Sequence, residues 1–140
     1  MGKIVLVINN FSWFGKRTFR TWLPAVPIIT SLLKDQFDFS ILDANVNNWS
    51  LEQTENEIRK TNAELILISA LSVDYQEQYH ALAAIAKQAL PGCITLMGGV
   101  YPTTLPYQTL EDENINVIMQ GHAEERLPKI VELILKRRWE

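Results

Sequence analysis

The sequence predicts an α/β fold built on a parallel β-sheet, and two observations support this prediction. Five apolar runs typical of buried strands alternate with segments whose apolar residues recur at helical spacing. The chain has 140 residues, of which 47% are hydrophobic, so it can form one substantial core but is short for two domains. We therefore expect residues 1–140 to form a single domain.

The five predicted strands are rich in β-branched and aliphatic residues, as strands covered on both faces are. They are Lys3–Ile8, Phe37–Leu42, Leu65–Leu71, Cys93–Met97 and Val117–Gln120. Between and after them, the helical spacing predicts helices over Pro27–Lys34, from Ser50 onward, from Asp74 to Leu90, within Pro102–Asp112 and from Glu124 to Arg138. Because crossovers between parallel strands are right-handed, this alternation predicts a flavodoxin-like three-layer αβα sandwich with strand order 2-1-3-4-5.

Several predicted helix ends have a chemical reason. Ser50 is followed three residues later by Gln53, which is the pattern of a capping box. Asp74 is placed to cap the next helix, and Pro91-Gly92 ends it. We expect His80, within that helix, to be a surface residue.

The segment from Phe11 to Pro24 shows no clean period and is unusually aromatic. Its aromatic residues are Phe11, Trp13, Phe14, Phe19 and Trp22. These side chains either line a ligand or a neighbouring domain, or they pack around the first helix. We expect residues 11–22 to be more mobile than the sheet, or to be ordered by another copy of the chain.

Composition argues against several classes of protein. The net charge is −3 and there is no sustained basic run, so we expect no binding to nucleic acid. No apolar stretch reaches the ~20 residues that span a bilayer, and no signal peptide is recognisable, so we expect a cytoplasmic protein without a membrane partner. The single cysteine, Cys93, excludes an internal disulfide and a three-cysteine iron–sulfur motif within these residues. We expect Cys93 to be buried.

Two of the predicted strands end in unusual residues. One runs into Ser69-Ala70-Leu71-Ser72, and the next ends at Gly98-Gly99. Ligands of open α/β sheets bind at the carboxyl ends of the strands, so the two endings outline a pocket at one edge. Glycine lets a bulky ligand approach the backbone, although a glycine pair can also serve the turn alone. On the ligand interpretation, a Gly99→Val change is expected to lower ligand retention sharply while the fold survives.

The same residues resemble those of a known family. Ser69-Ala70-Leu71 followed by Gly98-Gly99 looks like the S-x-L…GG pattern of cobalamin-binding domains. The continuation from Gly98 to Thr103, Gly-Gly-Val-Tyr-Pro-Thr, is similar to the GGxxPT variant of cobalamin-dependent radical SAM enzymes. Cobalamin domains that ligate cobalt through histidine carry D-x-H-x-x-G after the first strand, and here that loop has no histidine. The resemblance therefore implies cobalamin without histidine ligation from this loop.

The resemblance also implies a set of site residues. Ser69, Leu71 and Ser72 would contact the nucleotide tail of cobalamin, and Gly98 and Gly99 would let the displaced dimethylbenzimidazole pass close to the backbone. Seven further residues would contact the tail or the corrin amides: Val100, Tyr101, Pro102, Thr103, Gln120, Gly121 and His122. A histidine that directly precedes a helix is more typical of a cap or an amide contact than of an axial ligand, so we do not expect His122 to ligate cobalt.

The function implied is a cobalamin-binding module of a radical SAM enzyme, which positions cobalamin for methyl transfer or related radical chemistry. S-adenosylmethionine and a [4Fe-4S] cluster would belong to a following radical SAM domain of the same polypeptide, because these residues contain no catalytic or metal-ligand constellation. The alternative is a degenerate domain that keeps the fold as a structural or interaction module. An FMN site is disfavoured by the bulky first loop, and a phosphoacceptor domain by the missing aspartate after the third strand.

Overall fold

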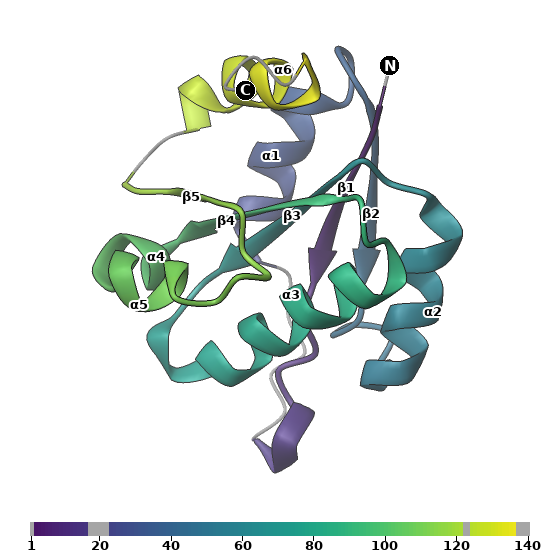
Figure 1. The fold of residues 1–140 in the computed structure, drawn as a ribbon, viewed down its shortest axis with the longest axis vertical. Helices are drawn as coiled ribbons and strands as arrows, with labels where there is room; N and C mark the ends of the chain where they lie inside the picture. The colour runs from purple at the N-terminus through teal and green to yellow at the C-terminus, as the bar shows by residue number, and fades with distance from the viewer. Residues whose placement is uncertain (1, 17–22, 122–123, 137–140) are drawn as a thin grey trace.

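The computed structural model describes residues 2–16, 23–121 and 124–136. It contains one five-stranded parallel sheet in the order β2-β1-β3-β4-β5, so the predicted fold class and strand order are confirmed (Figure 1). The strands are β1 (Lys3–Ile8), β2 (Asp38–Asp43), β3 (Leu65–Ala70), β4 (Ile94–Gly99) and β5 (Val117–Met119). The fourth strand extends two residues beyond its predicted end, so the glycine pair belongs to the sheet.

The helices form the two outer layers of the sandwich. Helices α1 (Ala25–Leu33) and α6 (Leu127–Lys136) cover one face of the sheet, and α2 (Leu51–Thr61) and α3 (Gln76–Ala89) cover the other. Each face has its own apolar cluster, because alternate residues of the buried strands point to opposite sides. Two short helices, α4 (Val100–Thr104) and α5 (Pro106–Leu110), follow the carboxyl end of β4.

Of the helix caps predicted from the sequence, one is confirmed and one is not. The capping box of α2 is confirmed, since Gln53 N donates to Ser50 Oγ and Ser50 N donates to Gln53 Oε1. The predicted cap at Asp74 is wrong. Ser72 Oγ instead accepts a hydrogen bond from Asp74 N at 3.2 Å, at the start of a 3₁₀ turn (Val73–Tyr75) that precedes α3.

The single short helix predicted after β4 is two helices. Leu105 separates them with φ −127° and ψ 63°, outside the helical region. The cause is Pro106, whose ring disfavours helical angles at the residue before it and suits the first position of α5. A 3₁₀ turn (Glu124–Arg126) likewise precedes α6. Across the described ranges, no helix is long and apolar enough to cross a membrane.

Two aromatic residues of the segment after β1, Phe11 and Trp13, pack into the protein, whereas Phe14 is 52% exposed. Phe11 is completely buried and meets the Tyr75 ring edge-on at 4.7 Å, and Trp13 is 6% exposed with its Nε1 donating to Trp49 O at 3.0 Å. Phe11 belongs to the cluster that includes α1, so it packs around the first helix. Phe19 and Trp22 lie outside the described residues, as does the second half of the segment for which mobility is predicted, residues 17–22.

Cys93 lies just before β4 and is 3% exposed, which confirms its predicted burial. Burial raises the pKa of its thiol. The side chain therefore behaves as a small apolar group of the core.

Candidate functional site

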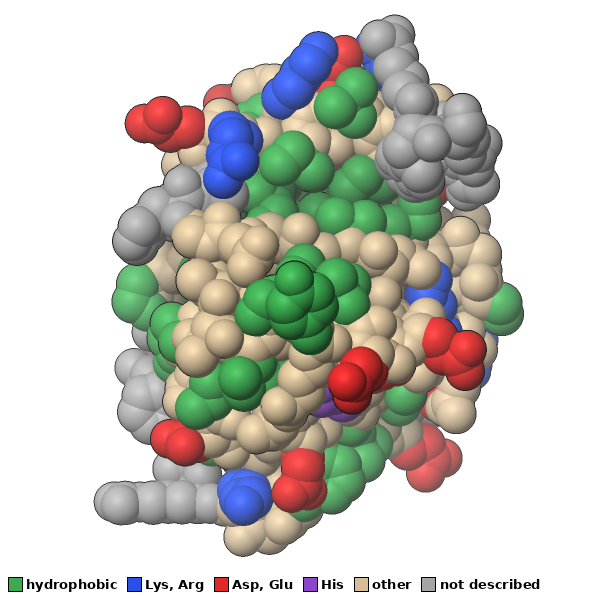
Figure 2. Space-filling model, turned by 60° about the vertical axis from the view of Figure 1, so that its left-hand side comes forward, with side chains coloured by type: hydrophobic (Ala, Val, Ile, Leu, Met, Phe, Trp, Pro, Cys, Tyr) green, Lys and Arg blue, Asp and Glu red, His purple; other side chains and the backbone are tan. Residues whose placement is uncertain are grey.

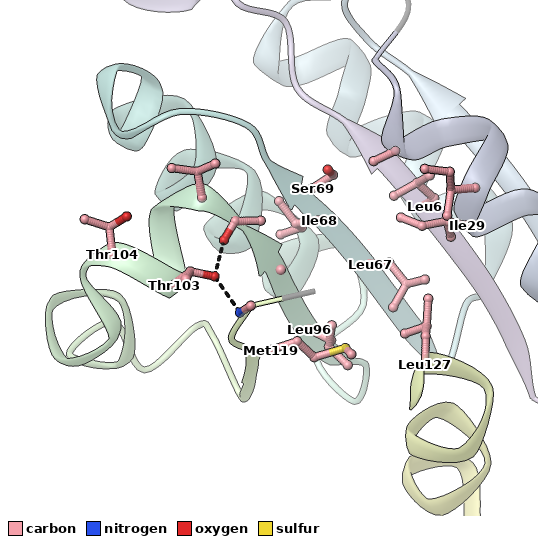
Figure 3. A pocket seen from close by; sticks show the side chains of 16 residues that line it. Leu6, Ile29, Leu67, Ile68, Ser69, Leu96, Thr103, Thr104, Met119 and Leu127 are labelled. Atoms are coloured by element: carbon pink, nitrogen blue, oxygen red, sulfur yellow. Dashed lines mark hydrogen bonds between the residues drawn. The ribbon is translucent and has the colours of Figure 1, made fainter. Parts of the chain in front are cut away.

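A cavity of about 340 Å³ lies between the sheet and the helices α1 and α6, at the carboxyl end of the central strands. Figure 3 shows side chains of β1, β3, β4, β5, α1, α4 and α6 around it. In Figure 2, a hollow lined by hydrophobic side chains lies below the upper end of the molecule, where Figure 1 places α1 and α6. The cavity is therefore at the edge where the sequence predicts a pocket.

The floor of the cavity is a row of three paired residues, Ser69, Gly98 and Met119, on neighbouring strands. A Cβ placed on Gly98 meets nothing closer than Met119 Cβ, at 3.8 Å. The backbone at Gly98 is not in the positive-φ region that favours glycine. The missing side chain at Gly98 therefore serves to open the cavity rather than to relieve the backbone.

Gly99 has a different role from its neighbour. Its φ is +113°, and a Cβ there would lie 2.5 Å from the carbonyl oxygen of Ala70, on the adjacent strand. Both the dihedral angle and this contact require glycine whether or not a ligand is bound. The expectation that a side chain at Gly99 sharply lowers ligand retention and spares the fold is at odds with this geometry.

Thr103 of α4 joins the end of β4 to the segment that follows β5. Its Oγ1 donates to Gly99 O at 2.7 Å and accepts from Gly121 N at 2.9 Å (Figure 3). The hydroxyl thus has a donor and an acceptor partner inside the protein. Thr103 shapes the cavity mouth by holding these two segments together.

We expect a Thr103→Val change to remove both hydrogen bonds with little change of shape, and to lower the free energy of unfolding by about 1–3 kcal/mol. The measurement is chemical denaturation of the two proteins. Thr104→Val is the matched control, since Thr104 also lines the cavity but its hydroxyl has no hydrogen bond within the described residues. Equal losses for the two variants would contradict the bridging role of Thr103.

The lining of the cavity is apolar and neutral. It contains no charged side chain among the described residues, and its polar side chains are hydroxyls. Its members are Leu6, Ala25, Ile28, Ile29, Leu67, Ile68, Ser69, Leu96, Gly98, Gly99, Val100, Thr103, Thr104, Met119, Gly121 and Leu127. Such a lining suits an uncharged, largely apolar group better than a phosphate.

Six of the twelve predicted site residues line the cavity, namely Ser69, Gly98, Gly99, Val100, Thr103 and Gly121. Leu71, Ser72 and Gln120 follow the same strands but are not part of the lining, and His122 lies outside the described residues. Ser72 stabilises the turn that precedes α3. Its N donates to Tyr79 Oη at 3.0 Å, and its Oγ accepts from Asp74 N. Burial raises the pKa of Tyr79 to about 12, so this hydroxyl stays protonated at neutral pH.

Two further predicted site residues, Tyr101 and Pro102, are buried and do not line the cavity. Tyr101 is completely buried on the α3 side of the sheet, where its ring stacks on Tyr79 at 6.0 Å, and Pro102 is also buried. Tyr101 Oη lies 2.6 Å from His80 Nε2, so His80, which was expected at the surface, is partly exposed (27% of its side chain) and also contacts a buried residue. The side chain of Tyr101 does not face the position in which a ligand of this cavity would sit.

Sequence reasoning missed most of the apolar lining. Ala25, Ile28 and Ile29 of α1 and Leu127 of α6 line the cavity, but their helical spacing is the same as that of ordinary core residues. Leu6, Leu67 and Leu96 likewise belong to strands that read as uniformly buried. These residues become recognisable only when the space opened by Gly98 is known.

The carboxyl edge of the sheet also carries an exposed apolar residue in each of four loops. Phe14, Val46, Leu71 and Val100 follow β1, β2, β3 and β4, and are 52%, 48%, 37% and 52% exposed. These side chains add exposed apolar surface to the edge at which the cavity opens. The described residues contain no group of three or more His, Cys, Asp or Glu side chains that could hold a metal ion.

An open parallel sheet with a neutral cavity at its carboxyl edge defines a cofactor-binding α/β domain. The chain belongs to the B12 binding domain family, which matches residues 22–131. It is 26% identical over 133 residues to the anaerobic magnesium-protoporphyrin IX monomethyl ester cyclase of Cereibacter sphaeroides. The aligned region covers 92% of this chain and 22% of the cyclase.

Two solved structures share the fold. The cobalamin-dependent S-adenosylmethionine radical enzyme OxsB, with aqua-cobalamin and S-adenosylmethionine bound, superposes with a TM-score of 0.74 at 16% identity over 97% of this chain and 19% of OxsB. The monomethylamine corrinoid protein of Methanosarcina barkeri superposes with a TM-score of 0.59 at 16% identity over 88% of this chain and 54% of that protein. The chain thus spans about a fifth of the length of the cyclase and of OxsB.

Proposed function

We propose that this chain is a cobalamin-binding module of a B12-dependent radical SAM enzyme, and that the cavity above Gly98 receives the nucleotide tail of cobalamin. The observation that carries the proposal is the open floor at Gly98, at the carboxyl edge of the sheet, where open α/β sheets bind their ligands. With a volume of about 340 Å³, the cavity falls within the ~300–1,000 Å³ range of small-molecule sites.

The residues of the cavity fit a flat, neutral heterocycle such as dimethylbenzimidazole. Gly98 provides room against the sheet, Met119 and Leu127 provide apolar walls, and the Ser69 hydroxyl can hydrogen-bond a ring nitrogen or a ribose oxygen. The corrin ring would then cover the exposed apolar side chains that follow β1 to β4. With this assignment, both the apolar cavity and the exposed apolar side chains at the carboxyl edge of the sheet would contact cobalamin.

We further propose that no histidine of this chain ligates the cobalt. The loop after β1 contains no histidine, and His80 lies beneath α4 on the other face of the sheet. When bound, cobalamin supplies a cobalt–carbon bond from which a methyl group can be transferred or a radical formed. The residues of this chain would bind and orient the cofactor, without a catalytic group of their own.

The substrate chemistry would depend on a radical SAM domain in the same polypeptide, with its own S-adenosylmethionine and [4Fe-4S] cluster. The relatives support this part of the proposal, because the chain matches only about a fifth of each of them. A cytoplasmic location, as expected from the sequence, is consistent with the reducing conditions that such a cluster requires.

The test is to mix the purified domain with hydroxocobalamin, remove free ligand by desalting, and record the absorption spectrum. We expect a coloured complex whose spectrum lacks the features of dimethylbenzimidazole bound to cobalt, because the base lies in the cavity. A His122→Ala variant should give the same spectrum. A colourless protein would contradict the proposal and favour the degenerate structural module, and a shift caused by His122→Ala would contradict the ligation assignment.

A further inference from the structure

A connected set of polar side chains lies behind α4, on the side away from the cavity. His80 of α3 is held between two partners: its Nδ1 lies 2.7 Å from Asp112 Oδ2, and its Nε2 lies 2.6 Å from Tyr101 Oη. Tyr101 comes from α4, and Asp112 follows α5. Three consecutive helices of the chain are therefore joined by one imidazole.

The neighbouring hydrogen bonds indicate which atoms of Gln76, Gln108 and Tyr101 donate and which accept. Gln76 Nε2 donates to Val73 O at 3.2 Å, so its Oε1 is the atom that accepts from Gln108 Nε2. The second hydrogen of Gln108 Nε2 is directed at Tyr101 Oη, 3.3 Å away. Tyr101 Oη accepts this bond, and its own proton is free to be donated elsewhere.

In the arrangement in which Tyr101 Oη donates to His80 Nε2, the imidazole carries a hydrogen on Nδ1 and donates it to the Asp112 carboxylate. A chain of hydrogen bonds thus runs from Gln108 through Tyr101 and His80 to Asp112. All the polar atoms of these contacts are satisfied, as is typical of networks that specify one arrangement of packed elements.

The position of α4 depends on this network because the helix is too short to be stable alone. It has five residues, and isolated helices of this length do not persist in water. One side of α4 carries Tyr101, while Val100, Thr103 and Thr104 line the cavity. A shift of Tyr101 would therefore move the cavity lining as well.

We propose that His80 is a positioning residue for the cofactor cavity: through Tyr101 it holds α4 where Val100, Thr103 and Thr104 form the cavity wall. The role in cofactor binding rests on the proposed function, whereas the role in placing α4 does not. His80 itself is not among the residues that line the cavity.

The first measurement uses the ligand-free domain and two variants, His80→Ala and Tyr101→Phe. The second variant keeps the buried ring and removes only the oxygen that His80 holds, so it remains informative if His80→Ala folds poorly. We expect the amide of Leu105, which donates to Tyr101 O at 2.9 Å, to exchange its hydrogen about tenfold faster in both variants. The NMR methyl signals of Val100 and Thr103 should shift as well.

The control is Ile58→Val, which loosens the same apolar cluster from α2 without touching the network. It should leave the Leu105 amide and the two methyl signals unchanged. Unchanged exchange at Leu105 in both His80→Ala and Tyr101→Phe would overturn the positioning role.

The second measurement is the affinity for hydroxocobalamin, which we expect to fall about tenfold in His80→Ala and Tyr101→Phe but not in Ile58→Val. An unchanged affinity, despite faster exchange at Leu105, would overturn the link between the network and cofactor binding. A wild-type domain that retains no cobalamin would refute the proposed function, and the methyl signals would still decide whether the network positions the cavity wall.

Discussion

A Gly98→Val variant is expected to lose cobalamin retention while keeping its fold. Valine suits a strand, the backbone at Gly98 needs no positive φ, and the new Cβ makes an ordinary contact with Met119. Its two methyl groups would occupy the floor of the cavity, where we place the benzimidazole. Since overpacking of this kind costs about 1–3 kcal/mol, we expect the affinity for hydroxocobalamin to fall by roughly 100-fold.

The control for Gly98→Val is the same substitution at a glycine that is remote from the cavity. Gly92 lies in the turn after α3, and a Cβ there meets nothing within 4 Å. Gly92→Val should therefore bind hydroxocobalamin as the wild type does, and thermal unfolding should be similar for both variants. Normal binding by Gly98→Val would mean that the nucleotide tail does not use this cavity.

A Gly99→Ala variant is expected to lose stability instead. The added Cβ would sit 2.5 Å from the Ala70 carbonyl oxygen, and alanine disfavours a φ of +113°. We expect the free energy of unfolding to fall by about 3 kcal/mol and the thermal midpoint by roughly 10 °C, with or without ligand.

The matched control for this prediction is Gly98→Ala, which differs by one position along the same strand. It should stay within about 1 kcal/mol of the wild type in chemical denaturation, because its Cβ makes only an ordinary van der Waals contact with Met119 Cβ, at 3.8 Å. If Gly99→Ala instead unfolds like the wild type and loses only cobalamin binding, the glycine at position 99 serves the ligand and our assignment of the two glycines is wrong.

The local sequence determined the order of the elements and the location of the site. Uniformly apolar runs that alternate with segments of helical spacing predicted buried parallel strands, and the order 2-1-3-4-5 is one of those that right-handed crossovers allow. Ser50 and Gln53 formed the predicted cap because that bond needs only residues of one turn. Placement of Ser69 and Gly98 at the same sheet edge followed from strand direction alone.

The tertiary structure decided what each residue of that edge does. The sequence gives no reason to assign different roles to Gly98 and Gly99. In the structure, the nearby Ala70 carbonyl shows that the backbone requires glycine at position 99, whereas the distance to the Met119 side chain shows that Gly98 leaves space at the cavity floor. Tyr101 faces the core because a five-residue helix takes its orientation from the helices around it, here through His80. Such contacts join residues far apart in the chain, so periodicity and spacing along the sequence cannot reveal them.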